Sequence, residues 1–130
     1  DFPLATLQPE FSALSVEPAF DGVLDYAMSR NMTPLAWSPL AGGKLATDGT
    51  GADAAVRRVT GRLDELAAKY ETSRTAVAIA FVLRHPSNPV PIIGSQSLDR
   101  IRSSVDALKV SLTRSEWYSL VVAARGEPLP

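Results

Sequence analysis

Two arginines stand where a helix is expected to begin, in the stretch PIIGSQSLDRIR (residues 91–102). Ser97 is a typical N-cap, so Arg100 and Arg102 lie close to backbone N–H groups that already carry partial positive charge. Each arginine costs roughly a few tenths of a kcal/mol there unless an anion neutralises it. A strand that leads into a helix through small residues is a common anion cradle, to which Ser95 can add a hydroxyl donor. The segment therefore suggests a phosphate site, and the alternative is that both arginines are solvated and Ser97 is only a cap.

A second candidate segment is AWSPLAGGKL (residues 36–45), in which a short apolar run ends on an aromatic residue and continues into a proline and a glycine pair. Ligands of α/β folds bind in such loops, at the carboxyl edge of the sheet. Trp37 could stack on a planar ring, although a strand tryptophan is more often core, and the glycines could simply form a turn. Gln8 ends an earlier apolar run, and its carboxamide can both donate and accept hydrogen bonds. Taken alone, however, it is an ordinary polar residue and does not indicate a binding site.

The rest of the sequence predicts the elements that position these residues. Short apolar runs predict strands, over residues 4–8, 34–37 and 90–93. Apolar residues at helical spacing predict helices, over residues 20–31, 56–70 and 75–85. The helix over 75–85 is apolar nearly all round and is expected to be buried. Two further helices are expected, one from Leu98 and one after a capping box of Thr113 with Glu116.

Strands that alternate with helices predict an α/β fold with a parallel sheet, right-handed crossovers and strands covered on both faces. Three strands make an incomplete sheet, so the first and last would leave exposed edges and an open core. Residues 44–53 are rich in Gly, Thr, Ala and Asp, which predicts a mobile linker.

Composition narrows the classes of function. The chain of 130 residues is 45% hydrophobic and 21% charged, with a formal net charge of −1, as in one soluble globular domain. The charges are interspersed, which argues against a nucleic-acid partner. No apolar run reaches the roughly 18 residues of a membrane span, and the sequence starts without a secretory leader pattern. The absence of cysteine excludes a thiolate metal site and fits a cytoplasmic location.

Taken together, LQPEFS, AWSPLAGGKL and PIIGSQSLDRIRSS, in this order ahead of a C-terminal helix, resemble the second half of the aldo-keto reductases. The resemblance covers nearly the whole chain. It implies strands six to eight of a (β/α)8 TIM barrel with their helices and a C-terminal helix. Residues 1–130 would then be the C-terminal, cofactor-binding portion of a single barrel domain. The family binds NADP(H) in an extended conformation without a Rossmann fingerprint.

The resemblance also implies roles for individual residues. Gln8 would hydrogen-bond the nicotinamide carboxamide, and Trp37 would stack on the nicotinamide ring. The pyrophosphate would be wrapped by Ser38, Pro39, Leu40, Ala41, Gly42, Gly43, Lys44 and Leu45. The adenosine 2′-phosphate would be held by Gly94, Ser95, Gln96 and Ser97. Arg100 would pair with that phosphate and lie against adenine.

The sequence departs from the family pattern at two places. Gly94 stands where some branches of the family carry a lysine. Ser103 and Ser104 replace a Glu-Asn pair that commonly contacts adenine, so Ser104 remains a candidate cofactor contact with a different side chain. Cofactor affinity is therefore expected to be altered.

No catalytic residue is expected in this chain, because the family's Asp, Tyr, Lys and His come from the first half of the barrel. His85, the only histidine, precedes a proline at a helix end, where its charged form would suit the helix dipole. Tyr26, Tyr70 and Tyr118 lie on or near helices. Lys44 is better placed to touch a phosphate than to tune a tyrosine.

We therefore expect the cofactor-binding half of an NADP(H)-dependent oxidoreductase that acts on a carbonyl substrate, needs no metal and is inactive alone. The chain would be a fragment of a longer enzyme, and its short tail suggests an open substrate site. The open sheet predicts self-association or pairing with the missing N-terminal half. The alternative is a non-catalytic nucleotide-binding or regulatory barrel subunit.

Overall fold

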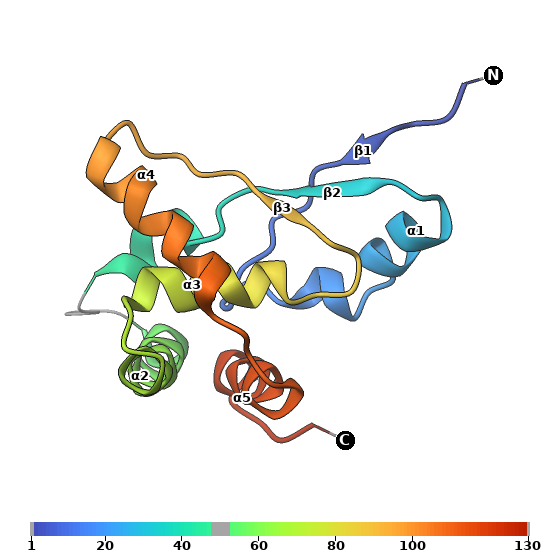
Figure 1. The fold of residues 1–130 in the computed structure, drawn as a ribbon. Coiled ribbons are helices and arrows are strands. Elements are labelled where there is room, and N and C mark those ends of the chain that lie inside the picture. The colour runs from blue at the N-terminus through green and yellow to red at the C-terminus, as the bar shows by residue number, and fades with distance from the viewer. Residues whose placement is uncertain (1, 48–52, 130) are drawn as a thin grey trace.

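The computed structural model describes residues 2–47 and 53–129, and in this part of the chain strands alternate with helices (Figure 1). The strands are β1 (Thr6–Leu7), β2 (Thr33–Ala36) and β3 (Val90–Pro91). The α-helices are α1 (Val23–Ser29), α2 (Ala54–Lys69), α3 (Arg74–Leu83), α4 (Leu98–Ser104) and α5 (Arg114–Arg125). Short 3-10 helices are η1 (Glu17–Ala19), η2 (Ala41–Ala46) and η3 (Val105–Lys109). The predicted order of strands and helices is confirmed.

The strands form one parallel sheet in the order β1-β2-β3, as the alternation of elements predicts. Thr6 lies opposite Thr33, and Leu35 lies opposite Val90. Strands β1 and β3 are shorter than predicted and form the two edges of the described sheet. Proline residues lie within or near both strands. Because proline has no N–H to donate, the ladder of hydrogen bonds between the strands ends early.

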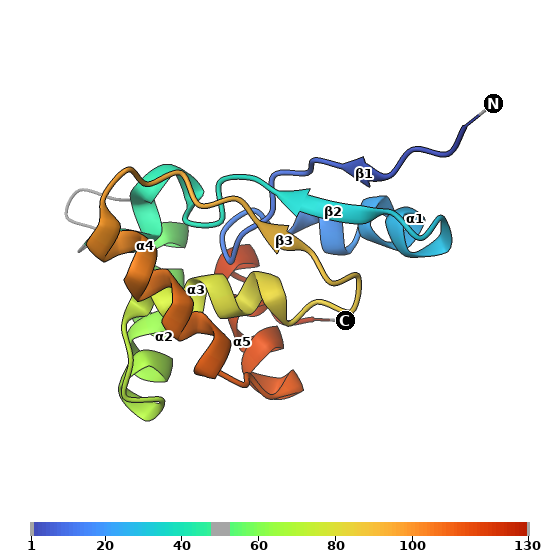
Figure 2. The ribbon, with the colours of Figure 1, turned by 45° about the horizontal axis from the view of Figure 1, so that its top comes forward.

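Side chains of β2 alternate between a covered face and an open face of the sheet. Pro34 and Ala36 are buried, whereas Trp37, just after the strand, is 45% exposed. On β3 and just after it, Val90 and Ile92 are also exposed. The helices that contact β2 and β3, α1 and α3, lie on one side of the strands (Figures 1 and 2). The expectation that both faces are covered is therefore wrong for the described residues, because these helices pack on one side only.

Side-chain caps start the longer helices. Asp53 accepts the N–H of Val56 at the start of α2, and Ser73 accepts the N–H of Ala76 at the start of α3. The predicted capping box at the start of α5 is present, since Thr113 and Glu116 each accept a backbone N–H from the other. Each such cap stabilises a helix by about 0.5–2 kcal/mol.

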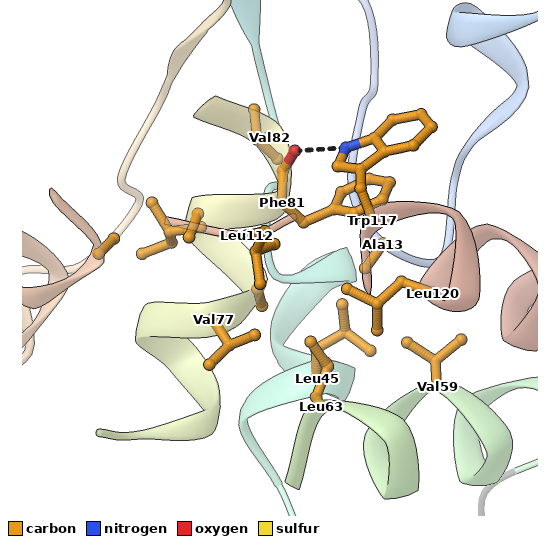
Figure 3. Packing of buried hydrophobic residues seen from close by; sticks show 14 of the residues in the cluster. Ala13, Leu45, Val59, Leu63, Val77, Phe81, Val82, Leu112, Trp117 and Leu120 are labelled. Carbon is orange, nitrogen blue, oxygen red and sulfur yellow. Dashed lines mark hydrogen bonds between the residues drawn. The ribbon is translucent and has the colours of Figure 1, made fainter. Parts of the chain in front are cut away.

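The core lies among helices α2, α3 and α5 and the loops that pack against them (Figure 3), and it also includes Ala36 of β2. Helix α3 is buried over residues 76–82, as its all-round apolar sequence predicts. The rings of Phe81 and Trp117 stack with centroids 4.8 Å apart, and the Trp117 Nε1–H donates to the Phe81 carbonyl at 2.9 Å. Leu45 of η2 is fully buried in the same cluster. This packing ties a loop at the sheet edge to the helices beneath it.

The predicted linker over residues 44–53 is only partly described. Residues 44–46 belong to η2, and Asp53 caps α2, so the ends of this segment have defined structure. Residues 48–52 lie outside the described residues. Among the helices of the described part, none combines the length and apolar character needed to cross a bilayer.

Candidate cofactor site at the strand ends

The three predicted segments follow the carboxyl ends of the three parallel strands and therefore lie at one edge of the sheet. Gln8 follows β1, Trp37 follows β2, and Gly94 comes shortly after β3. The elements that continue from β2 and β3, η2 and α4, lie beyond the same end of the sheet in both views (Figures 1 and 2). This edge is where α/β folds bind ligands.

Trp37 has a fixed backbone and an accessible ring. Its N–H donates to the Pro9 carbonyl at 3.1 Å, and its own carbonyl accepts the N–H of Phe11 at 3.4 Å. The side chain is 45% exposed. The interpretation of Trp37 as a core tryptophan is therefore wrong, and Trp117 on α5 fills that role instead. An exposed indole on a rigid strand end can stack on a planar ring.

The loop after Trp37 has an unusual backbone. Ser38 and Ala41 adopt left-handed φ angles of 53° and 51°, and Gly42 and Gly43 follow with 65° and 91°. Such angles cost a residue with a Cβ about 1–3 kcal/mol, so the surroundings must impose them. Two hydrogen bonds do so, because the Ser38 carbonyl accepts the Ala41 N–H at 2.8 Å and the Ser38 Oγ accepts the Gly42 N–H at 2.7 Å.

The predicted loop residues do not all present side chains to solvent. Pro39, Ala41 and Leu45 are buried, so their side chains belong to the core and only their backbone can face a ligand. Lys44 and Gly42 are exposed. The remaining loop residues are half-buried: Ser38, Leu40 and Gly43.

Small polar residues form the turn into α4, as predicted. Ser95 Oγ accepts the Ser97 N–H at 3.2 Å, and Ser97 Oγ accepts the Arg100 N–H at 3.5 Å. Each hydroxyl uses its oxygen in this way and keeps its own O–H to donate. Gln96 is exposed, and a Cβ on Gly94 would meet no atom within 4 Å. The space beside Gly94 is therefore open.

The two arginines of α4 differ in their partners. An Arg102 nitrogen lies 4.0 Å from a carboxylate oxygen of Asp99, in an exposed i,i+3 pair. Arg100 has no side-chain hydrogen bond or ion pair within the described residues. Its carbonyl accepts the hydroxyls of Ser103 and Ser104, so these two side chains are engaged within the helix. The unneutralised charge at the start of α4 therefore belongs to Arg100.

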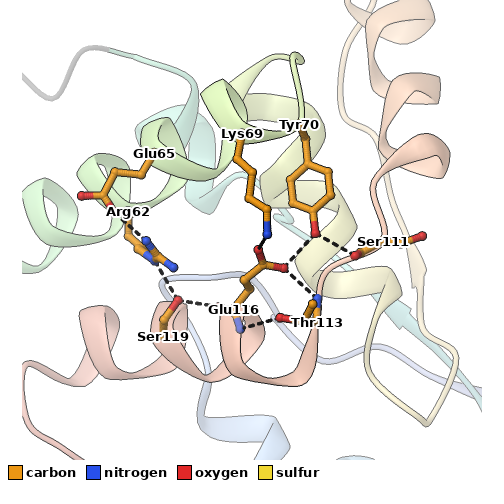
Figure 4. A network of polar contacts seen from close by, with 8 residues as sticks. All are labelled: Arg62, Glu65, Lys69, Tyr70, Ser111, Thr113, Glu116 and Ser119. Atoms are coloured by element: carbon orange, nitrogen blue, oxygen red, sulfur yellow. Dashed lines mark hydrogen bonds and ion pairs between the residues drawn. The ribbon is translucent and has the colours of Figure 1, made fainter.

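A tyrosine, a lysine and a carboxylate do meet in the structure, between helices α2 and α5 (Figure 4). At the C-terminal end of α2, Lys69 Nζ lies 2.5 Å from Glu116 Oε1 on α5, and the Tyr70 hydroxyl donates to Glu116 Oε2 at 2.8 Å. Burial and the bond to Glu116 raise the pKa of Tyr70, which makes it a weaker acid. Burial alone would raise the pKa of Glu116, but hydrogen bonds from Lys69, Thr113 and Tyr70 together lower it to about 2. This cluster joins α2 to α5, and the Glu116 carboxylate accepts hydrogen bonds from Lys69, Tyr70 and the Thr113 N–H.

His85 is a structural residue. Its side chain is buried edge-on to Phe11, with ring centroids 5.7 Å apart. Its Nδ1 accepts the N–H of Ser87 at 3.2 Å and lies 2.9 Å from the Ser87 hydroxyl. Burial lowers the pKa of His85, which favours the neutral ring.

Sequence reasoning missed the contacts that hold the far end of η2. Arg74, the first residue of α3, donates from Nη1 to the carbonyl of Thr47 and from Nε and Nη2 to both carboxylate oxygens of Asp64. A cation in the first turn of a helix is repelled by the partial positive charge of the helix N-terminus, and the same repulsion applies to Arg100 in α4. That signal is present in the sequence after Ser73, but it does not say which carboxylate or carbonyl resolves it.

Comparison with known proteins gives one consistent family. A sequence model described as the aldo/keto reductase family matches residues 1–124. The chain is 48% identical over 127 residues to a protein named 6-dehydroglucose reductase from Novosphingobium aromaticivorans, covering 98% of this chain and 41% of that protein. It is 38% identical over 124 residues to a protein of the same name from Agrobacterium fabrum, covering 95% of this chain and 40% of that protein.

The fold has a counterpart among solved structures. The crystal structure of a thermostable aldo-keto reductase in complex with the inhibitor epalrestat matches with a TM-score of 0.77 and 21% identity, over 93% of this chain and 40% of that one. At this identity the match shows only that the folds are similar. The chain spans about two fifths of the length of the relatives that it matches.

Proposed function

Because this chain belongs to the aldo/keto reductase family, we propose that it is the cofactor-binding half of an NADP(H)-dependent reductase. In this proposal its three strands are the sixth to eighth of a (β/α)8 barrel, and its helices are those that follow them. The whole enzyme reduces a carbonyl compound. The name 6-dehydroglucose reductase, carried by two relatives, points to a sugar carbonyl as the first substrate class to test.

The observation that carries the proposal is the unpartnered Arg100 beside the Ser95 and Ser97 hydroxyls. A doubly charged phosphate suits one guanidinium and two O–H donors at a turn with open space. Trp37 offers an exposed ring at the same sheet edge for the other end of an extended dinucleotide. The residues present therefore fit NADP(H).

Each group has a defined task in this proposal. Arg100, Ser95 and Ser97 bind the 2′-phosphate, and Gly94 and Gln96 line the same turn. The η2 loop presents its backbone and Lys44 to the pyrophosphate. Trp37 orients the nicotinamide ring by stacking, and Gln8 fixes its rotation through the carboxamide. The bound cofactor supplies hydride chemistry at C4 of the nicotinamide.

Catalytic groups are assigned to a part of the enzyme outside this chain. Within the described residues, Tyr70 and Lys69 are bound to Glu116 away from the strand ends, and His85 is buried. The same observation favours the second candidate, a non-catalytic nucleotide-binding or regulatory barrel subunit. Both candidates bind NADP(H), and only the first becomes active when the rest of the barrel is supplied.

The open face of the sheet supports the idea of a missing partner. Trp37, Val90 and Ile92 are 40–49% exposed on it, and β1 and β3 are unpaired at their outer edges in the described sheet. We propose that the remainder of a barrel, or a second copy of the chain, covers these edges.

The test is to titrate the purified chain with NADPH by calorimetry and then assay NADPH oxidation with aldehydes and sugar carbonyls. We expect binding without turnover, and turnover once the N-terminal portion of a homologous reductase is supplied. Failure of the folded chain to bind NADPH would contradict both candidates. Turnover by the chain alone, at verified mass, would contradict the assignment of catalysis to another segment.

A further inference from the structure

The η2 segment is held at each of its ends by a polar contact. At its start, the Ser38 Oγ accepts the Gly42 N–H at 2.7 Å. At its end, the Thr47 hydroxyl donates to the Lys44 carbonyl at 3.3 Å, and the Thr47 carbonyl accepts Nη1–H of Arg74. Between these ends Leu45 is buried in the core. The contact from Arg74 spans 27 residues and is a polar tie between the loop and α3, beside the apolar packing of Leu45.

Asp64 determines the direction in which the Arg74 guanidinium points. Both carboxylate oxygens of Asp64, on α2, accept hydrogen bonds from Nε and Nη2 of Arg74, at 2.6 Å and 2.7 Å. This bidentate pair fixes the plane of the guanidinium, and Nη1 is left to reach Thr47. The Arg74 side chain is 22% exposed, so the pair is only partly screened by solvent.

We propose that Arg74, oriented by Asp64, is a positioning residue for the cofactor loop. The inference rests on the proposed function, because it assumes that the η2 backbone faces the pyrophosphate. Arg74 acts through the Thr47 carbonyl and does not itself touch the cofactor. Its task is to hold the left-handed residues at positions 41–43 in place before binding, so that ordering the loop costs less when the cofactor arrives.

The rival explanation is that Arg74 only joins α2 to α3. In that case its loss would lower the stability of the whole chain and leave the loop no more mobile than the helices. A second rival is that its positive charge simply attracts the anionic cofactor through space, in which case a lysine would serve equally well. The two rivals differ from the proposal in measurable ways.

The experiment compares Arg74→Met, Arg74→Lys and the control Arg62→Met in the full chain. Arg62 is a suitable control because it is 33% exposed, pairs with Glu65 and bonds Ser119, away from η2. Hydrogen exchange is followed at the amides of Gly43 and Leu45, which both donate to the Leu40 carbonyl, and at Val77 in α3. NADPH dissociation constants are measured by calorimetry, and melting temperatures are recorded for every variant.

Both Arg74 variants are expected to exchange the two loop amides about tenfold faster, with α3 unchanged. NADPH should bind about 5- to 10-fold more weakly in both variants, since the single ammonium group of lysine cannot bind both Asp64 oxygens and the Thr47 carbonyl in the geometry of the guanidinium. Arg62→Met should change neither quantity. Unchanged loop exchange in Arg74→Met, or full recovery of affinity by lysine, would overturn the proposal. Faster loop exchange with unchanged NADPH affinity would also overturn the proposal. If the unaltered chain fails to bind NADPH, the proposed function is overturned instead, and the exchange rates alone then show whether Arg74 holds the loop.

Discussion

At the scale of single residues, Trp37 links the fold to the proposed cofactor most directly. Its ring is exposed on a strand end whose backbone is fixed by Pro9 and Phe11, so its removal should leave the fold intact. Stacking of a ring on an aromatic side chain contributes roughly 1–3 kcal/mol, so Trp37→Ala should weaken NADPH binding about 5- to 150-fold. Calorimetric titration measures the change.

Trp37→Phe is the matched control, because it keeps an aromatic face and should lose less affinity than the alanine variant. The circular dichroism of both variants should match that of the unaltered chain. If Trp37→Ala binds NADPH as tightly as the unaltered chain, the indole does not stack on the cofactor and its exposure needs another explanation.

Glu116 controls stability at low pH. Its folded-state pKa of about 2 lies below the ordinary value of 4.5 because Lys69, Thr113 and Tyr70 outweigh its burial. Its contribution to stability is therefore fully present above pH 4.5 and is lost as pH falls toward 2. Because Lys69 is exposed, we expect a loss of about 1–3 kcal/mol over this range, less than full linkage would give.

Urea unfolding at a series of pH values tests this contribution. Glu116→Gln should be less stable than the unaltered chain at pH 7, and the difference should shrink as pH falls below 4.5. Glu17→Gln, at an exposed position on η1, serves as the control and should show no such convergence. A constant difference between Glu116→Gln and the unaltered chain down to pH 2 would contradict the role of the Lys69–Glu116 pair.

At the scale of elements, the end of α5 depends on a left-handed glycine. Gly126 has φ of 76°, and a Cβ there would lie 2.7 Å from Nη2 of Arg58, whose Nε donates to the Ala123 carbonyl. Gly126→Ala should therefore destabilise the chain by about 1–2 kcal/mol, through the backbone and the displaced cap. Gly61→Ala, in the middle of α2 with open space around it, should stabilise by about 0.5–1 kcal/mol.

Chemical denaturation of the two variants side by side gives the sign of each effect. The pair is informative because the substitution is the same and only the backbone conformation and surroundings differ. Equal effects at Gly61 and Gly126 would mean that the left-handed turn at the end of α5 does not determine where the helix stops.

The elements could be predicted largely because their signals are local. Ser97 is an N-cap, and Thr113 with Glu116 forms a capping box at fixed spacing, and the structure confirms both. The covered or open state of each sheet face could not be predicted, since it depends on which helices pack there. The Arg74 contact with Thr47 was missed for the same reason, because it joins residues 27 positions apart.

The site could be predicted in part for a related reason. Types and spacing of residues after parallel strands indicate which segments meet at one sheet edge, and Gln8, Trp37 and Gly94 do follow the three strand ends. The burial of Ala41 and Leu45 depends on the packing of η2 against α2 and α3, and the exposure of Trp37 depends on which sheet face the helices leave open, so neither could be read from the sequence. The contacts of these residues with a cofactor stay predictions.

At the scale of the whole molecule, the fold separates a packed side from an open side. Helices α1 and α3 cover one face of the sheet, and the other face exposes apolar residues beside β1 and β3, the two edge strands of the described sheet. The relatives have about two and a half times the length of this chain, since the chain covers 41% and 40% of two of them. In the proposed function, the additional structure of a longer reductase covers this open side.

The proposed function depends most on the anion that neutralises Arg100. Helical geometry rotates Arg102 by roughly 200° from Arg100, and Arg102 already has Asp99 as a partner, so only Arg100 is free to face the strand-end site. A charge-assisted hydrogen bond contributes roughly 1.5–3 kcal/mol, so Arg100→Ala should weaken NADPH about 10- to 150-fold and NADH far less. The NADPH preference of the unaltered chain should also shrink with added salt.

The decisive measurement is therefore the pair of dissociation constants, for NADPH and for NADH, of the unaltered chain, Arg100→Ala and the control Arg102→Ala, obtained by fluorescence titration. We expect Arg100→Ala to remove most of the preference for NADPH and Arg102→Ala to keep it. If Arg100→Ala weakens both cofactors equally, or if the unaltered chain shows no preference, a 2′-phosphate does not neutralise Arg100 and the central claim is contradicted.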